Sequence, residues 1–227
     1  MKDFLLDFRN TKYCFENFIA VERNLEAKRM AVDFASNEDI CQTLVISSTI
    51  GNGATHLAYA ILNKIKENLN LSNDDFAFFT YESLKNEFLF ERTIEPQFLK
   101  NKKAVCIDGF YERGREGVQM LDSILTNVHT KIIITCGEEI QVTIPHERIH
   151  LSCPSAQDQK IIIEKMFQQN DLLISDDVLK FIANLGINSI RRLEAFINSL
   201  YIQSILNHQK INLELTKLTF EKFSAHM

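Results

Sequence analysis

Short apolar runs alternate with stretches of helical periodicity between residues 43 and 152, and this alternation constrains the fold more than any other feature. Most of the runs are continuous rather than interrupted by polar residues, which is typical of strands buried on both faces. Such strands joined by helices form a parallel sheet with helices on both faces, so we predict an α/β fold. The expected strands are 43–48, 76–80, 104–108, 131–135 and 149–152, and the expected helices between them are 55–69, one that begins at Glu82, and 116–128.

The pattern changes near Pro154, after which the periodic stretches are helical and no strand run intervenes. We therefore predict that the α/β domain is followed by a small all-helical domain. A further helix is expected before the first strand, at 24–34, with Asn24 as its N-cap, because an Asn side chain accepts a hydrogen bond from the first helical turn. The helices expected after Pro154 are 156–169, 176–185, 189–207 and 215–223.

Composition excludes several classes of protein. The formal net charge is −5 at pH 7, which argues against a protein that holds nucleic acid through clustered Lys and Arg. The five cysteines form no Cys-x-x-Cys pair and indicate a reducing compartment in which thiols stay free. The sequence shows neither a secretory signal nor an apolar run of membrane-spanning length, so we expect a cytoplasmic protein with no membrane partner.

The segment after the first expected strand is similar to the phosphate-binding pattern Gly-x-x-x-x-Gly-Lys-[Ser/Thr]. Gly53 and Thr55 match the pattern, whereas Ser48 stands at the first Gly and Ala54 at the Lys. Glycines let backbone N–H groups turn toward a phosphate, and a helix N-terminus follows. A Lys beside the phosphates would contribute on the order of a few kcal/mol at the dielectric of a surface cleft. We therefore expect backbone groups alone to hold a nucleotide weakly.

The third expected strand ends in Asp108, which is followed by Gly109. A nucleotide-hydrolysing fold places one acid for Mg²⁺ at this point, and often a second acid that activates water. Asp108 meets the first need, and Gly109 cannot meet the second. The sequence therefore predicts that the chain does not hydrolyse ATP and is not an enzyme.

Together these motifs resemble the DnaA family of AAA+ proteins, both the nucleotide-binding domain of the replication initiator and a shorter member, the regulator Hda. Residues 13–19 are similar to the family's aromatic approach to the adenine pocket, and Thr55-His56-Leu57 is similar to the end of its Walker A loop. Residues 189–195, Ser-Ile-Arg-Arg-Leu-Glu-Ala, are similar to its sensor 2 signature. The resemblance covers about residues 8–225 and implies a P-loop AAA+ fold followed by a helical lid.

The resemblance implies an N-terminal peptide at 1–10, an AAA+ nucleotide-binding-type domain at 11–153 and a lid at 154–227. It places Walker B at Val105 to Asp108, the sensor 1 residue at Thr135, and the phosphate-contacting Arg of the lid at Arg191. ADP or ATP with Mg²⁺, weakly bound, is the implied cofactor. The implied nucleotide-binding residues are Phe15, Phe18, Gly51, Asn52, Gly53, Ala54, Thr55, His56, Asp108, Thr135 and Arg191.

Residues 3–8, Asp-Phe-Leu-Leu-Asp-Phe, resemble a degenerate form of the peptide Gln-Leu-x-Leu-x-Phe, with which Hda-type proteins bind the sliding clamp of DNA polymerase. Phe4, Leu6 and Phe8 are the residues expected to bind the clamp. Leu6 and Phe8 would fill a hydrophobic groove, each contributing about 1.5–3 kcal/mol of gross burial. Asp3 stands where the motif prefers Gln. The alternative is that this segment packs on the chain's own core as a strand or staple.

The resulting hypothesis is an Hda-like regulator of replication initiation whose partners are the sliding clamp and the DnaA initiator. It needs an Arg at the interface with the initiator, for which Arg148 is the nearest candidate. One alternative is an ATP-dependent helicase loader or initiator-like ATPase in which Lys102 or Lys103 reaches the phosphates. Another is a structural partner of DnaA-type proteins that does not contact the clamp.

Two further expectations concern DNA binding and metal ions. The chain ends after the lid helices, so we expect no sequence-specific DNA binding, while an oligomer is left open. His146, His150 and Cys153 have a spacing that a zinc site could use, but a fourth ligand is missing and we predict no metal centre.

Overall fold

The computed structural model describes residues 13–37, 42–91, 99, 101–111, 115–125, 130–137, 140–170 and 172–225. The chain divides into two compact units. The first contains residues 1–18 together with 24–152, and the second contains residues 19–23 together with 153–227.

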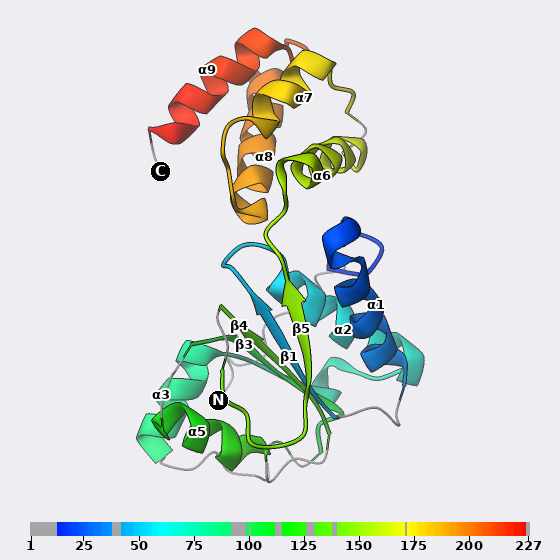
Figure 1. The fold of residues 1–227 in the computed structure, drawn as a ribbon, viewed down its shortest axis with the longest axis vertical. Helices are drawn as coiled ribbons and strands as arrows, with labels where there is room; N and C mark the ends of the chain where they lie inside the picture. Colours follow the sequence, from blue (N-terminus) through cyan, green and yellow to red (C-terminus); the bar gives the residue numbers. More distant parts are fainter. Residues whose placement is uncertain are drawn as a thin grey trace. The chain divides into compact units, whose positions relative to one another are not determined.

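The described part of the first unit contains a five-stranded sheet, and every pairing in it is parallel (Figure 1). The order across the sheet is β2-β3-β4-β1-β5, so β1 lies between β4 and β5. Because the strands are parallel, their carboxyl ends share one edge, where the segments after β1, β3 and β4 begin. The strands are β1 (Thr43–Ser48), β2 (Phe76–Thr80), β3 (Ala104–Phe110), β4 (Lys131–Cys136) and β5 (Glu147–Leu151).

Helices cover both faces of this sheet. Helices α1 (Leu25–Ser36) and α2 (Ala54–Leu69) lie on one face, and α3 (Tyr81–Glu91) and α5 (Arg115–Leu125) lie on the other (Figure 1). Two short 3-10 helices, η1 (Glu22–Asn24) and η2 (Asn73–Asp75), precede α1 and β2. The buried residues between the sheet and the α3–α5 layer include Val45, Ala77, Phe79, Leu84, Val105, Ile107, Leu121, Ile132 and Ile134.

The second unit is helical in its described part and has its own core. Side-chain caps stabilise the starts of two of its helices: the Ser155 Oγ accepts from the Asp158 N–H, and the Asn212 Oδ1 accepts from the Leu215 N–H. The helices are α6 (Ala156–Gln168), α7 (Asp176–Ala183), α8 (Ile190–Leu206) and α9 (Leu213–Ser224). Buried core residues include Val21, Ile163, Phe167, Val178, Ile182, Leu193, Phe196, Ile197, Leu200 and Leu215.

The structure confirms the predicted parallel sheet with helices on both faces and the helical region that follows it. Strands β1 and β2 have the predicted bounds. Asn24 occupies the predicted N-cap position of α1. Its side chain makes no capping hydrogen bond, and its Oδ1 accepts instead from the Ser152 N–H at 3.1 Å. Among the described helices, none is long and apolar enough to span a membrane.

Candidate nucleotide-binding site

The loop between β1 and α2 has the backbone conformation of a phosphate cradle. Gly51 and Gly53 have φ angles of 86° and 104°, in the left-handed region that glycine adopts without strain. The turn between them is closed by Asn52, whose N–H donates to the Thr49 carbonyl at 3.2 Å and whose Nδ2 donates to the Thr49 Oγ1 at 2.7 Å. The Asn52 side chain is therefore engaged in shaping the loop.

Helix α2 begins directly after this cradle. Gly53 occupies its N-cap position, and the first helical hydrogen bond runs from the Leu57 N–H to the Gly53 carbonyl at 2.9 Å. The N–H groups of the first helical turn have no acceptor within the helix, and they carry the positive end of its dipole. Ala54 is the first residue of the helix, and no side chain caps it. The loop and helix together can accept an anion through the backbone alone.

Two hydroxyls and a carboxylate meet at the carboxyl edge of the sheet. The Thr55 Oγ1, on α2, donates to the Asp108 carboxylate at 3.0 Å, and the Thr135 Oγ1, on β4, donates to the same carboxylate at 2.6 Å. The Thr135 Oγ1 also accepts from the Gly109 N–H at 2.8 Å. This cluster ties together the start of α2 and the ends of β3 and β4.

The cluster has the oxygen donors that Mg²⁺ prefers. The Thr55 hydroxyl and the Asp108 carboxylate lie within hydrogen-bonding distance of each other and beside the phosphate cradle. They therefore fit the predicted magnesium site. Thr135 is 2% exposed, so it supports Asp108 from inside the sheet.

Gly109 has a φ of 75°, and a Cβ built on it would meet nothing within 4 Å. The space is open, but the left-handed backbone favours glycine there. Because glycine has no side chain, the position after Asp108 supplies no second carboxylate.

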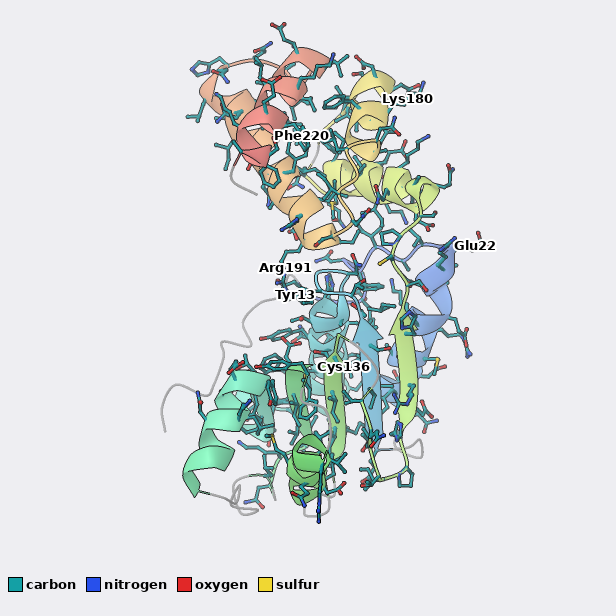
Figure 2. All side chains as sticks on the ribbon, turned by 60° about the vertical axis from the view of Figure 1, so that its left-hand side comes forward. Tyr13, Glu22, Cys136, Lys180, Arg191 and Phe220 are labelled. Atoms are coloured by element: carbon teal, nitrogen blue, oxygen red, sulfur yellow. The ribbon has the colours of Figure 1, made fainter. Side chains whose placement is uncertain are left out.

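Residues 13–18, which we call the aromatic strap, lie beside α2 (Figure 2). The Tyr13 ring is 5.0 Å from the ring of His56 and 5.5 Å from that of Tyr59. Phe15 and Phe18 are buried, and a Cβ built on Gly53 would lie 3.1 Å from the Phe18 ring. The absence of a side chain at Gly53 thus allows the strap to contact the phosphate cradle directly.

Burial sets the acidity of two groups near this cluster. Burial, with smaller effects of Cys106, Asp108 and Tyr13, raises the pKa of Tyr59 to about 12. Burial also raises the pKa of the Cys106 thiol, and the Asp108 carboxylate adds to the effect. Both groups therefore stay neutral at physiological pH, and Cys106 has none of the thiolate character that a nucleophile needs.

Comparison with known proteins shows what this chain is similar to. The family model described as the bacterial DnaA ATPase domain matches residues 9–107. The DnaA initiator of Buchnera aphidicola is 28% identical over 243 aligned residues, covering 94% of this chain and 53% of the relative. The DnaA initiator of Kosmotoga olearia is 24% identical, covering 98% of this chain and 54% of the relative.

The chain is similar to the bacterial DnaA ATPase domain.

It spans about half the length of these DnaA relatives. Among solved structures, domain III of Thermotoga maritima DnaA superposes with a TM-score of 0.78 at 21% identity, covering 94% of this chain and 98% of that one. Aquifex aeolicus DnaA bound to AMPPCP gives 0.70 at 18% identity, covering 87% and 67%. Thermotoga maritima RuvB gives 0.66 at 13% identity, covering 92% and 71%. These likenesses confirm the AAA+ fold.

The structure brings most of the predicted residues of this DnaA-like site together in the first unit, from the strap through the cradle to Asp108 and Thr135. Arg191 belongs to the second unit, where it lies at the start of α8 with an exposed side chain (Figure 2). Its predicted contact with phosphate stays a prediction. The predicted clamp-binding residues Phe4, Leu6 and Phe8 lie outside the described residues.

The proposal that Lys102 or Lys103 reaches the phosphates is wrong. Both residues precede β3 and lie at the amino edge of the sheet, level with the start of β1. The cradle begins after Ser48, and β1 rises about 16 Å between Thr43 and Ser48 at roughly 3.3 Å per residue. The phosphates would therefore lie beyond the reach of a Lys side chain from this edge. The Lys102 Nζ instead donates to the Asp74 carbonyl at 2.6 Å.

The other predicted residues have internal partners. The Arg148 Nε donates to the His146 Nε2 at 2.9 Å, and its Nη2 donates to the Ile140 carbonyl at 2.8 Å. His150 Nδ1 lies 3.1 Å from the Ser47 Oγ. Over the described residues, no three His, Cys, Asp or Glu side chains gather in a way that could hold a metal ion.

Sequence reasoning missed two residues that fix the strap. The Asn63 Nδ2 donates to the Tyr13 carbonyl at 2.8 Å, and the Lys28 Nζ donates to the Phe18 carbonyl at 3.4 Å. Asn63 lies seven residues after His56, on the same face of α2. That spacing was the available signal, but the acceptors are backbone carbonyls, which no side-chain pattern reveals.

Proposed function

We propose that this chain is an Hda-like regulator of chromosomal replication initiation that holds a nucleotide without hydrolysing it and acts through contacts with other proteins. Its partners in this proposal are the sliding clamp and the DnaA initiator. The observation that carries the proposal is an intact phosphate cradle on a DnaA-type fold with Ala54 at the Lys position and Gly109 at the position of the second acid.

The site supports binding in the following way. Backbone N–H groups at the start of α2 would hold the phosphates, and Phe15 and Phe18 would provide an apolar wall for the base. Thr55 and Asp108 would hold Mg²⁺, which when bound would neutralise part of the phosphate charge. Binding of this kind uses no side-chain cation from the cradle, so we expect it to be weak.

The same site disfavours hydrolysis. Phosphoryl transfer depends on positioning the attacking water and on stabilising charge around the transferred group. Gly109 cannot orient a water, and Ala54 cannot neutralise the γ-phosphate. Thr55 and Thr135 both donate to Asp108, which satisfies that carboxylate within the protein. These features support a site that stabilises the fold or responds to nucleotide binding, and that does not hydrolyse the nucleotide.

The proposed partners rest on sequence resemblance. The clamp contact would be made by the peptide at residues 1–10 through Phe4, Leu6 and Phe8. In the proposed mechanism, the clamp-bound chain completes an interface with the initiator and promotes hydrolysis of the initiator's own ATP. Arg148 is the candidate for the Arg at that interface. Its Nε and Nη2 are held inside the first unit, so it would reach a partner through Nη1.

A steady-state ATPase assay tests the nucleotide part of this proposal. We expect the purified chain with Mg²⁺ to release phosphate no faster than buffer. Asp108→Asn should leave that background unchanged, as should Asp33→Asn, a control at an exposed position of α1. ATP turnover that disappears in Asp108→Asn and persists in Asp33→Asn would refute the proposal and show a working ATPase.

A further inference from the structure

The aromatic strap is attached to α2 by one side chain close to the phosphate cradle. The His56 Nε2 lies 3.1 Å from the Cys14 carbonyl oxygen. A carbonyl oxygen only accepts hydrogen bonds, so the Nε2 carries the hydrogen and donates it. The same Cys14 oxygen accepts from the Phe18 N–H at 3.1 Å. His56 therefore binds the acceptor that closes the turn of the strap.

The imidazole ring also packs against both ends of the strap. Its centroid lies 5.0 Å from that of Tyr13 and 5.4 Å from that of Phe18, with interplanar angles of 60° and 81°. Both arrangements are edge-to-face, which is a favoured geometry for aromatic pairs. This hydrogen bond and these two ring contacts thus hold the strap at a fixed position along α2.

The strap fixed in this way sets the position of Phe18 against the cradle. The Phe18 ring lies so near Gly53 that a Cβ added there would be 3.1 Å from it. His56 is in the first turn of α2, the turn whose N–H groups face the cradle. The same short helical segment therefore holds both the anion-binding N–H groups and the aromatic wall beside them.

We propose that His56 is a positioning residue that holds Phe18 and the aromatic strap against the phosphate cradle, and so sets the affinity for the nucleoside part of a bound nucleotide without contacting the phosphates. This inference rests on the proposed function, since it requires that the cradle holds a nucleotide. It predicts a selective effect: loss of the His56 contact weakens a ligand that has a base and spares one that has only phosphates.

Other bonds to the strap limit the size of the effect. Asn63 and Lys28 donate to the Tyr13 and Phe18 carbonyls, so the strap stays attached when His56 is replaced. We therefore expect the Phe18 ring to shift and fluctuate rather than to leave the cradle. The affinity for a nucleotide should fall by about tenfold, not vanish.

The experiment compares His56→Leu, which keeps an apolar side chain but loses the donor, with His56→Gln, which restores an N–H donor at a similar reach. Asn68→Ala, at an exposed position of the same helix, is the control. Calorimetry measures the affinity of each full-length protein for ADP and for pyrophosphate, and hydrogen exchange measures protection of the Phe18 amide.

His56→Leu should bind ADP about tenfold more weakly than the wild type and bind pyrophosphate within about twofold of it. The Phe18 amide should exchange faster in this variant. His56→Gln keeps the donor but loses the ring, so it should recover most of the ADP affinity and most of the protection. Asn68→Ala should resemble the wild type in all three measurements. Equal losses for ADP and pyrophosphate would overturn the inference, because they would show a general loss of structure. So would an unchanged ADP affinity in His56→Leu.

Failure of the proposed function gives a different result. If the wild type binds neither ADP nor pyrophosphate, the nucleotide-binding part of the proposal fails. The exchange rate of the Phe18 amide then decides whether His56 fixes the strap, and an unchanged rate in His56→Leu would overturn that as well.

Discussion

Ala54→Lys should raise the affinity of the chain for ATP with Mg²⁺ by about thirtyfold. Ala54 is the first residue of α2 and stands at the Lys position of the phosphate pattern. A unit charge about 4 Å from a phosphate oxygen gains roughly 4 kcal/mol at an effective dielectric of about 20. Ordering a Lys side chain offsets about 2 kcal/mol of this, and the net of about 2 kcal/mol corresponds to the expected factor.

Calorimetry of ATP binding checks this expectation, with Ala54→Met as the matched control. Met is unbranched and apolar, so it adds bulk at the same place without charge. We expect Ala54→Met to give no gain, and the gain from Lys to shrink as the salt concentration rises, because salt screens the added charge. Equal affinities for the Lys variant and the wild type would show that the cradle does not receive phosphate at this position.

Phe196→Ala should lower the free energy of unfolding of the helical unit by about 3–5 kcal/mol. Phe196, on α8, is 0% exposed, and its ring lies 5.7 Å from that of Phe220 and 5.4 Å from that of Phe223, both on α9. Figure 2 shows Phe220 among the side chains of these helices. The substitution removes the ring that fills the space between the two helices, so it leaves a cavity in the core of the unit.

Urea unfolding followed by far-ultraviolet circular dichroism measures this loss, since the chain contains no tryptophan for fluorescence. Tyr201→Ala is the control on the same helix, because Tyr201 is 40% exposed and its truncation should have a much smaller effect. The packing described for α8 and α9 would be contradicted if Phe196→Ala and Tyr201→Ala destabilised the protein equally.

The strands were predictable because their sequence signal is local. Residues 43–48 are a short, largely β-branched run and residues 76–80 are mostly aromatic, and the structure gives β1 and β2 these bounds. The end of β3 was harder to place, since the strand continues through Gly109 to Phe110. Glycine is unfavourable in strands, so the sequence suggested an earlier end.

Asn24 shows how a distant contact changes a local prediction. Its type and its place before a helical pattern are those of an N-cap. In the structure its side chain accepts a hydrogen bond from Ser152, 128 residues away in the sequence. No local pattern contains that partner. The N-cap position of Asn24 was therefore predictable, but its hydrogen-bond partner was not.

The same division holds in the candidate site. Thr55, Asp108 and Thr135 could be grouped from the sequence because each follows or ends a strand of one parallel sheet, and parallel strands bring their carboxyl ends together. The contact between His56 and the strap could not, because its acceptor is the Cys14 carbonyl. The prediction for Lys102 and Lys103 failed for the converse reason. Their charge suited the phosphates, but the strand direction places them at the amino edge of the sheet, opposite the cradle.

Binding to the replicative sliding clamp decides whether the chain acts through its N-terminal peptide. Surface plasmon resonance on immobilised clamp would compare the full chain with a form that lacks residues 1–8. We expect micromolar or tighter binding by the full chain and none by the shortened form. Absence of binding by both forms, or equal binding by both, would contradict the proposal that this chain acts through a clamp-binding N-terminal peptide.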